Sequence, residues 1–64
     1  MKSVYEMNPM EMRSAFGRCA DCAQKQIGLR RLRDYLALRD RNPTAAEYLL
    51  QQARLSLVHA RAYK

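Results

Sequence analysis

Asp40-Arg41-Asn42-Pro43-Thr44 is the stretch that decides the fold, because the residues on both sides of it have the pattern of helices. Proline disfavours helical geometry in the residue before it, so a helix arriving from the N-terminal side should end near Arg41. Thr44 should begin the next helix, since it is followed three residues later by Glu47, the spacing of a capping box. Two helices joined by so short a link must fold back on each other to remove their apolar faces from water.

The predicted fold class is therefore all-α, a helical hairpin with a long helix over 9–41 and a shorter one over 44–62. A short flexible arm over 1–8 precedes a single helical domain over 9–64, and its apolar residues could pack back onto a helix or a partner. Asn8 is a good N-cap, with Pro9 at the first helical position and Glu11 placed to complete a capping box. Gly28 costs about 1 kcal/mol relative to alanine inside a helix, but no loop-forming residues follow it. We predict one continuous helix bent there, with a three-helix chain broken at Gly28 as the alternative.

Both helices have apolar residues at spacings of three and four, as amphipathic helices do. The second helix also has a second apolar strip on its opposite side, formed by Tyr48, Leu55, Val58 and Ala62. A helix that is apolar on two sides is normally buried on two sides, and a lone hairpin covers only one. The core shared by the hairpin is expected to contain Leu29, Leu32, Leu36, Leu49, Leu50, Ala53 and Leu57.

The helix lengths also predict a partner. The long helix would span about 50 Å and the shorter one under about 30 Å, at 1.5 Å per residue, so the first turns of the long helix would lie uncovered. A chain of 64 residues has a small core, and proteins of this size often use a second copy of themselves. We therefore predict a homodimeric helical bundle. Its interface residues would be Phe16, Tyr48, Leu55, Val58 and Ala62.

Cys19-Ala20-Asp21-Cys22 has metal-ligand spacing. Zinc needs about four ligands, so a site would require both cysteines from both chains of a dimer. A thioredoxin-like redox pair needs its first cysteine at a helix start in a βαβ context. Here both cysteines fall within the predicted long helix on its apolar face, where free cysteine behaves as a small hydrophobe. We predict packing, without metal or cofactor, and keep the shared zinc site and redox chemistry as alternatives.

The net charge of +6 permits nucleic acid, an acidic protein or a membrane surface as the partner. A groove-binding helix should concentrate its arginines on one side, whereas those between residues 30 and 41 are distributed around the helix. Arg30 is also spaced to pair with Asp34. We predict solvated or salt-bridged arginines, with phosphate contact as the alternative. The residues for nucleic-acid contact would be Arg30, Arg31, Arg33 and Arg39.

We expect no enzyme, because a general base such as His59 would need a nucleophile, an oxyanion site and a pocket that two short helices do not supply. No apolar run approaches the roughly 20 residues of a membrane span, and no signal-peptide pattern is present. The expected location is therefore the cytoplasm, with reduced cysteines and no membrane partner.

The chain runs from Met7-Asn8-Pro9-Met10-Glu11-Met12-Arg13 through Leu57-Val58-His59-Ala60-Arg61-Ala62-Tyr63 and is short and rich in arginine. In these features its whole length resembles the small helical accessory proteins of the early regions of temperate lambdoid phages, including those encoded between the exonuclease and excisionase genes. The resemblance implies a non-enzymatic modulator that binds host or phage components in the host cytoplasm, and it assigns no functional residue. The predicted function is regulation by binding another protein, with a nucleic-acid-binding accessory regulator as the alternative.

Overall fold

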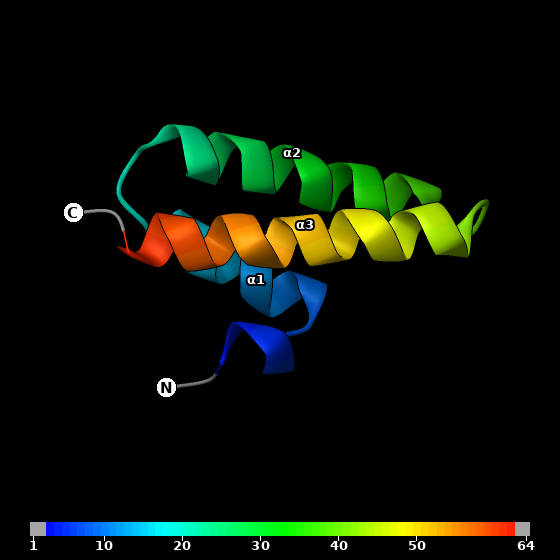
Figure 1. The fold of residues 1–64 in the computed structure, drawn as a ribbon, viewed down its shortest axis with the longest axis horizontal. Coiled ribbons are helices and arrows are strands. Elements are labelled where there is room, and N and C mark those ends of the chain that lie inside the picture. The colour runs from blue at the N-terminus through cyan, green and yellow to red at the C-terminus, as the bar shows by residue number, and fades with distance from the viewer. Residues whose placement is uncertain (1–2, 63–64) are drawn as a thin grey trace.

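The computed structural model describes residues 3–62. A 3-10 helix, η1 (Val4–Glu6), is followed by three α-helices: α1 (Pro9–Gly17), α2 (Ala23–Leu38) and α3 (Pro43–Ala62). Helices α2 and α3 run antiparallel along the long axis of the molecule, and α1 lies behind α3 in the view of Figure 1 and contacts both. The prediction of an all-α fold is confirmed.

The predicted long helix over 9–41 is wrong, because the chain leaves the helix between Gly17 and Ala23. The N–H of Arg18 and the N–H of Cys19 each bond, at 3.1 Å, to carbonyls three residues back, which tightens the end of α1. Cys22 is then extended, with φ −158° and ψ 168°, and α2 begins after it. The break lets α1 fold back onto α2 and α3, so that its apolar side chains leave water without a second chain.

Gly28, the predicted alternative break, lies inside α2. Packing requires glycine at position 28, because the ring of Phe16 lies directly on it and a Cβ at this position would overlap that ring. The absence of a side chain therefore allows α1 and α2 to approach closely. Gly28 therefore lies at a contact between two helices, and α2 continues through it.

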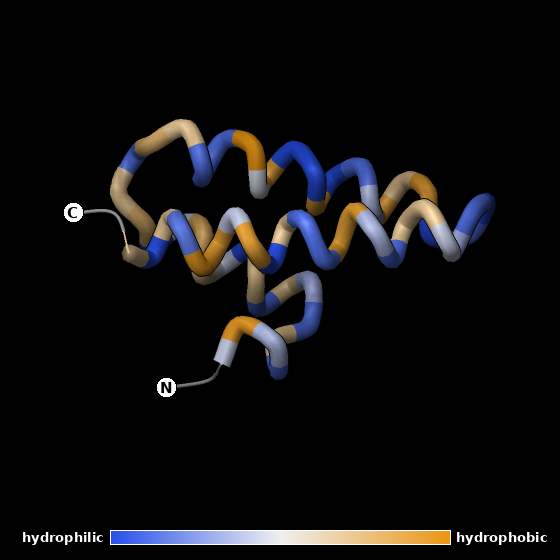
Figure 2. Tube along the Cα trace, in the orientation of Figure 1, coloured by the Kyte–Doolittle hydropathy of each residue, from blue (hydrophilic) through white to orange (hydrophobic). Residues whose placement is uncertain are grey.

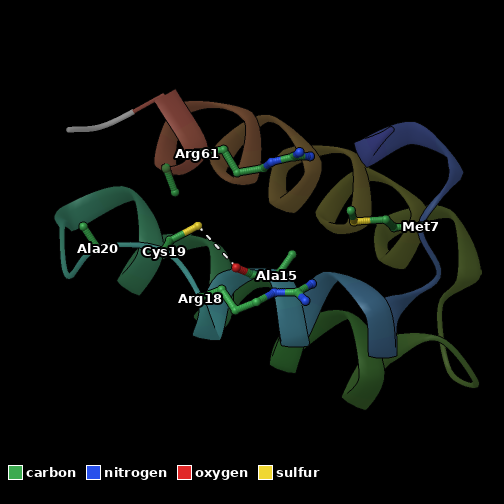
Figure 3. A pocket seen from close by; sticks show the side chains of 7 residues that line it. Met7, Ala15, Arg18, Cys19, Ala20 and Arg61 are labelled. Atoms are coloured by element: carbon green, nitrogen blue, oxygen red, sulfur yellow. Dashed lines mark hydrogen bonds between the residues drawn. The ribbon is translucent and has the colours of Figure 1, made fainter. Parts of the chain in front are cut away.

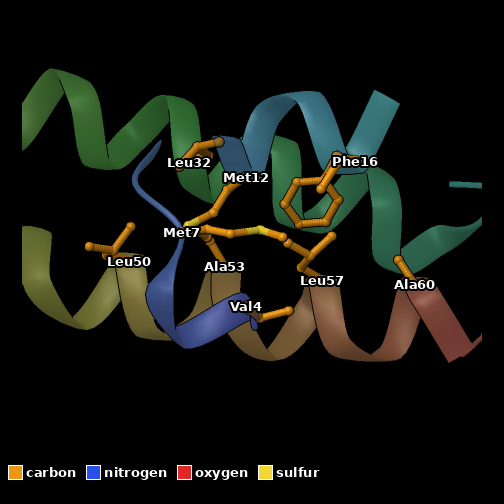
Figure 4. Packing of buried hydrophobic residues seen from close by; sticks show 10 residues of the cluster. Val4, Met7, Met12, Phe16, Leu32, Leu50, Ala53, Leu57 and Ala60 are labelled. Carbon is orange, nitrogen blue, oxygen red and sulfur yellow. The ribbon is translucent and has the colours of Figure 1, made fainter. Parts of the chain in front are cut away.

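The core lies where the three helices meet, and Phe16, Met12 and Leu57 have no exposed surface (Figure 4). Of the predicted core, four residues are buried and Leu29 and Leu49 are half-buried, but Leu36 is 40% exposed. Leu36 lies eight residues after Gly28, which turns it about 80° away from the buried side of α2. The buried apolar residues are Val4, Met7, Met12, Ala15, Phe16, Leu32, Ala46, Leu50, Ala53, Leu57 and Ala60.

The N-terminal segment over residues 3–8 packs back onto the helices. Val4 and Met7 are 6% and 8% exposed and belong to the core cluster, and η1 contacts α3. The hydroxyl of Ser3 accepts a hydrogen bond from the N–H of Tyr5 at 3.3 Å, which caps η1. Of the two expectations for this segment, a loose arm and packing onto a helix, the described residues show the second.

Both Asn-Pro pairs begin a helix. The capping box of α1 is confirmed: the N–H of Glu11 donates to Asn8 Oδ1 at 2.9 Å, and the N–H of Asn8 donates to Glu11 Oε1 at 3.1 Å. In α3, the side chain of Asn42 accepts from the N–H of Ala45 at 3.2 Å. The capping role predicted for Thr44 is therefore wrong, because Pro43 already occupies the first helical position, where its fixed φ suits the helix.

We expect Asn42→Ala to lower the free energy of unfolding by about 1 kcal/mol, the usual cost of removing a side-chain N-cap. Thr44→Ala, two residues later, should change it by less than about 0.5 kcal/mol, because that hydroxyl lies on the exposed first turn. Urea unfolding followed by circular dichroism compares the two variants at one protein concentration. Equal losses, or the larger loss at Thr44, would contradict the assignment of the cap.

Candidate protein-interaction surface

Helix α3 is covered on one side only. Its buried residues are Ala46, Leu50, Ala53, Ser56, Leu57 and Ala60, all on the side that faces α2, α1 and η1. In Figure 1, no other element lies in front of α3, and Figure 2 shows apolar segments along its length. The helix therefore has an outer side that no described part of the chain covers.

The outer side of α3 carries the second apolar strip predicted from the sequence. Tyr48 is 63% exposed, Leu55 45% and Val58 40%, and Ala62 is also exposed. These four residues are called the outer strip below. The period of α3 places them together opposite the core, because residues three, four and seven apart share a helix face.

Phe16, the fifth residue predicted at an interface between chains, lies instead in the core of this chain with no exposed surface. The interface prediction assumed a long helix that extends past its partner. Because the chain breaks after Gly17, α1 places Phe16 between α2 and α3, as Figure 4 shows. Phe16 is therefore a core residue and contributes nothing to the outer surface.

The four arginines predicted for nucleic-acid contact do not form one group. Arg31 is half-buried, and its Nη1 donates to the buried hydroxyl of Ser56 at 3.3 Å, so it joins α2 to α3. Arg30, Arg33 and Arg39 are exposed, with Arg39 at the C-cap of α2.

The ion pair expected between Arg30 and Asp34 is replaced, in the described part of the chain, by one between Arg33 Nε and Asp34 Oδ1 at 3.9 Å. Both side chains of this pair are well exposed to solvent, so it contributes little to stability. Arg30, Arg33 and Arg39 are therefore open to solvent, and the choice between solvated arginines and phosphate contact stays a prediction.

A basic cluster that the sequence did not reveal forms between α1 and α2. Arg13 and Arg33 border a groove of about 310 Å³ that is lined by leucines of α2, and Arg30 borders the adjoining hollow at Leu29. Arg13 joins this cluster only because α1 folds back beside α2. Its sequence position carried no signal for this, since the contact depends on a chain reversal that the helical pattern did not predict.

The cysteines lie at the connection between α1 and α2, and the prediction that both are in mid-helix is wrong. The Cys19 thiol donates to the carbonyl of Ala15 at 3.3 Å, and Cys22 is the N-cap of α2; both are half-buried free thiols. Residues 3–62 contain no group of three or more His, Cys, Asp or Glu that could hold a metal ion.

Cys19 lines a hollow of about 480 Å³ at the end of α1, shown in Figure 3. Arg18 and Arg61 lie on either side of it, and its apolar lining includes Ala15 and Ala60. The guanidinium groups make the mouth of this hollow basic.

The fold and its surfaces define a small, basic three-helix protein with an exposed apolar strip. No family model, curated protein or solved structure matches the chain. Among residues 3–62, none of the helices combines the length and the apolar character needed to cross a membrane.

Proposed function

We propose that the chain is a small non-enzymatic regulatory protein that acts by binding another protein through the outer strip of α3. The observation that carries this proposal is the exposure of Tyr48, Leu55 and Val58 on one face of a helix whose other face is already buried. Contiguous exposed apolar side chains mark interaction sites, and tyrosine is enriched in protein interfaces.

The resemblance to lambdoid phage accessory proteins supports a role in modulating host or phage regulation, in the host cytoplasm, through a host or phage protein. The uncovered strip on α3 and the small size of the core also support a homodimer. An overhanging long helix gives no such support, because α1 packs against α2 and α3 of its own chain. The proposal includes no cofactor.

A photo-crosslinking side chain at Val58 tests the proposed surface in bacterial cells that produce the protein. We expect irradiation to join position 58 to a polypeptide, whereas the same group at Ser14, an exposed position on α1, should give no product. Leu55→Asp, one turn away on the strip, should abolish the product by placing a charge in the contact while leaving the helical circular dichroism signal unchanged. Equal crosslinking from positions 58 and 14, or none from position 58, would contradict the proposal.

The second candidate function is a nucleic-acid-binding accessory regulator, and the cluster of Arg13, Arg30 and Arg33 is the observation that favours it. Three phosphate contacts would give a slope of about −2.7 for log affinity against log salt concentration. Titration into labelled duplex DNA at two salt concentrations measures this slope. The double variant Arg30→Glu with Arg33→Glu should lose the binding, while Arg39→Glu, a charge change outside the cluster, should retain most of it. Absence of binding at low salt would exclude this function.

A further inference from the structure

The outer strip of α3 has the spacing of a coiled-coil seam. The seam repeats every seven residues, at Tyr48, Leu55 and Ala62. Gln51 follows Tyr48 by three residues, and Val58 follows Leu55 by three. Alternating steps of three and four residues allow two helices to interdigitate along their length. We infer that the occupant of the strip is a second copy of this chain, whose α3 packs antiparallel to the first. The inference rests on the proposed function, and it names a second copy, in place of a host or phage protein, as the partner of that surface.

The residues beside the seam select the antiparallel orientation. Glu47, Arg54 and Arg61 follow one flank at seven-residue intervals, and Gln52 and His59 follow the other. In a parallel pair, each flank faces the opposite flank of the partner, so Glu47 would face glutamine and Arg54 would face histidine. In an antiparallel pair, each flank faces itself, and Glu47 of one copy reaches Arg61 of the other. Opposite charges beside a seam set the orientation of the helices.

Coverage of the whole seam, together with this pairing, selects the register. With Glu47 opposite Arg61, Tyr48 of one copy packs on Val58 of the other and Gln51 packs on Leu55. Two-fold symmetry repeats each of these contacts, so the seam and its two ion pairs are self-complementary.

The two antiparallel registers shifted by seven residues are less favourable. One would place Arg54 of one copy opposite Arg61 of the other and leave Glu47 without a cation to face. The other would pair Glu47 with Arg54, but it would place Val58 and Ala62 beyond the first residue of the partner's α3, so the seam would lose both. In the register with Glu47 opposite Arg61, the only like charges on this flank that face each other are the two Arg54 side chains, near the two-fold axis. Each Arg54 is half-buried in its own chain. Glu47 and Arg61 are both exposed, and Arg61 also borders the hollow beside Cys19.

Sedimentation equilibrium of the purified chain in reducing buffer tests the dimer and its orientation. We expect wild type to approach twice 7.5 kDa as its concentration rises, and Leu55→Asp to remain a folded monomer. Glu47→Arg and Arg61→Glu should each raise the dissociation constant about tenfold, because each places like charges at both symmetric contacts. The double variant Glu47→Arg with Arg61→Glu should return it to within about threefold of wild type, since the pair is restored in reverse.

Asp40→Arg is the matched control, because it makes the same charge change in the exposed turn before α3. It should have a smaller effect than Glu47→Arg. A wild type that stays monomeric, or a double variant that dimerises no better than Glu47→Arg, would overturn the inference. A monomer that still crosslinks from position 58 to a larger polypeptide would leave the proposed function standing alone. A monomer without any such product would remove both.

Discussion

Phe16→Ala is expected to lower the free energy of unfolding by about 3–5 kcal/mol, the cost of truncating a fully buried aromatic side chain. Phe16 has no exposed surface, and its ring fills the space between α1 and Gly28 of α2. At about 0.05–0.15 kcal/mol per residue, a chain of 64 residues has a total stability of roughly 3–10 kcal/mol. The variant should therefore be largely unfolded, or melt far below wild type, in thermal scans followed by circular dichroism.

Met10→Ala is the control for Phe16→Ala. Met10 lies on the same helix but is 72% exposed, so its truncation should change stability by less than about 0.5 kcal/mol. Both variants must be measured at one protein concentration, because dimerisation makes the melting temperature concentration-dependent. If both variants melted like wild type, α1 would not be packed on the other helices, and the continuous long helix would again explain the sequence.

Gly28→Ala is expected to destabilise the protein by about 1–3 kcal/mol, the usual cost of overfilling a packed core. Helix propensity alone predicts the opposite sign, a gain of about 1 kcal/mol for alanine in a helix interior. The packing term should dominate because the added Cβ would overlap the ring of Phe16, which is enclosed on all sides. Urea unfolding at one concentration gives the difference directly.

Gly17→Ala provides the matched comparison, since a Cβ at that position, the last residue of α1, meets no atom within 4 Å. It should be neutral or stabilising by up to about 1 kcal/mol. The double variant Phe16→Leu with Gly28→Ala should be less destabilised than the sum of its single changes, because the shorter side chain makes room for the new methyl group. Stabilisation by Gly28→Ala, or strict additivity in the double variant, would show that the contact between α1 and α2 is wrong.

The sequence determined the features that depend on residues near one another in the chain. Asn8 begins α1 because its own side chain and that of Glu11 satisfy free N–H groups of the first turn. Asn42 and Pro43 begin α3 for the same local reason, although Thr44 was the expected cap. The two apolar sides of α3 follow from helical periodicity, and that periodicity placed Tyr48 and Leu55 on a side that the rest of the fold leaves open.

Only the tertiary structure decided where the N-terminal half of the chain reverses. The apolar spacing from Met12 to Leu36 continues across residues 18–22, so the local pattern favoured one helix, and the burial gained by folding α1 back outweighed that preference. The reversal placed Phe16 on Gly28, 12 positions away, and brought Arg13 to the same groove as Arg33, 20 positions away. No local spacing encodes either arrangement. Hydrogen bonds within one turn can be deduced from neighbouring residues, whereas the packing of one helix on another depends on the complementary shapes of surfaces that only the folded chain brings together.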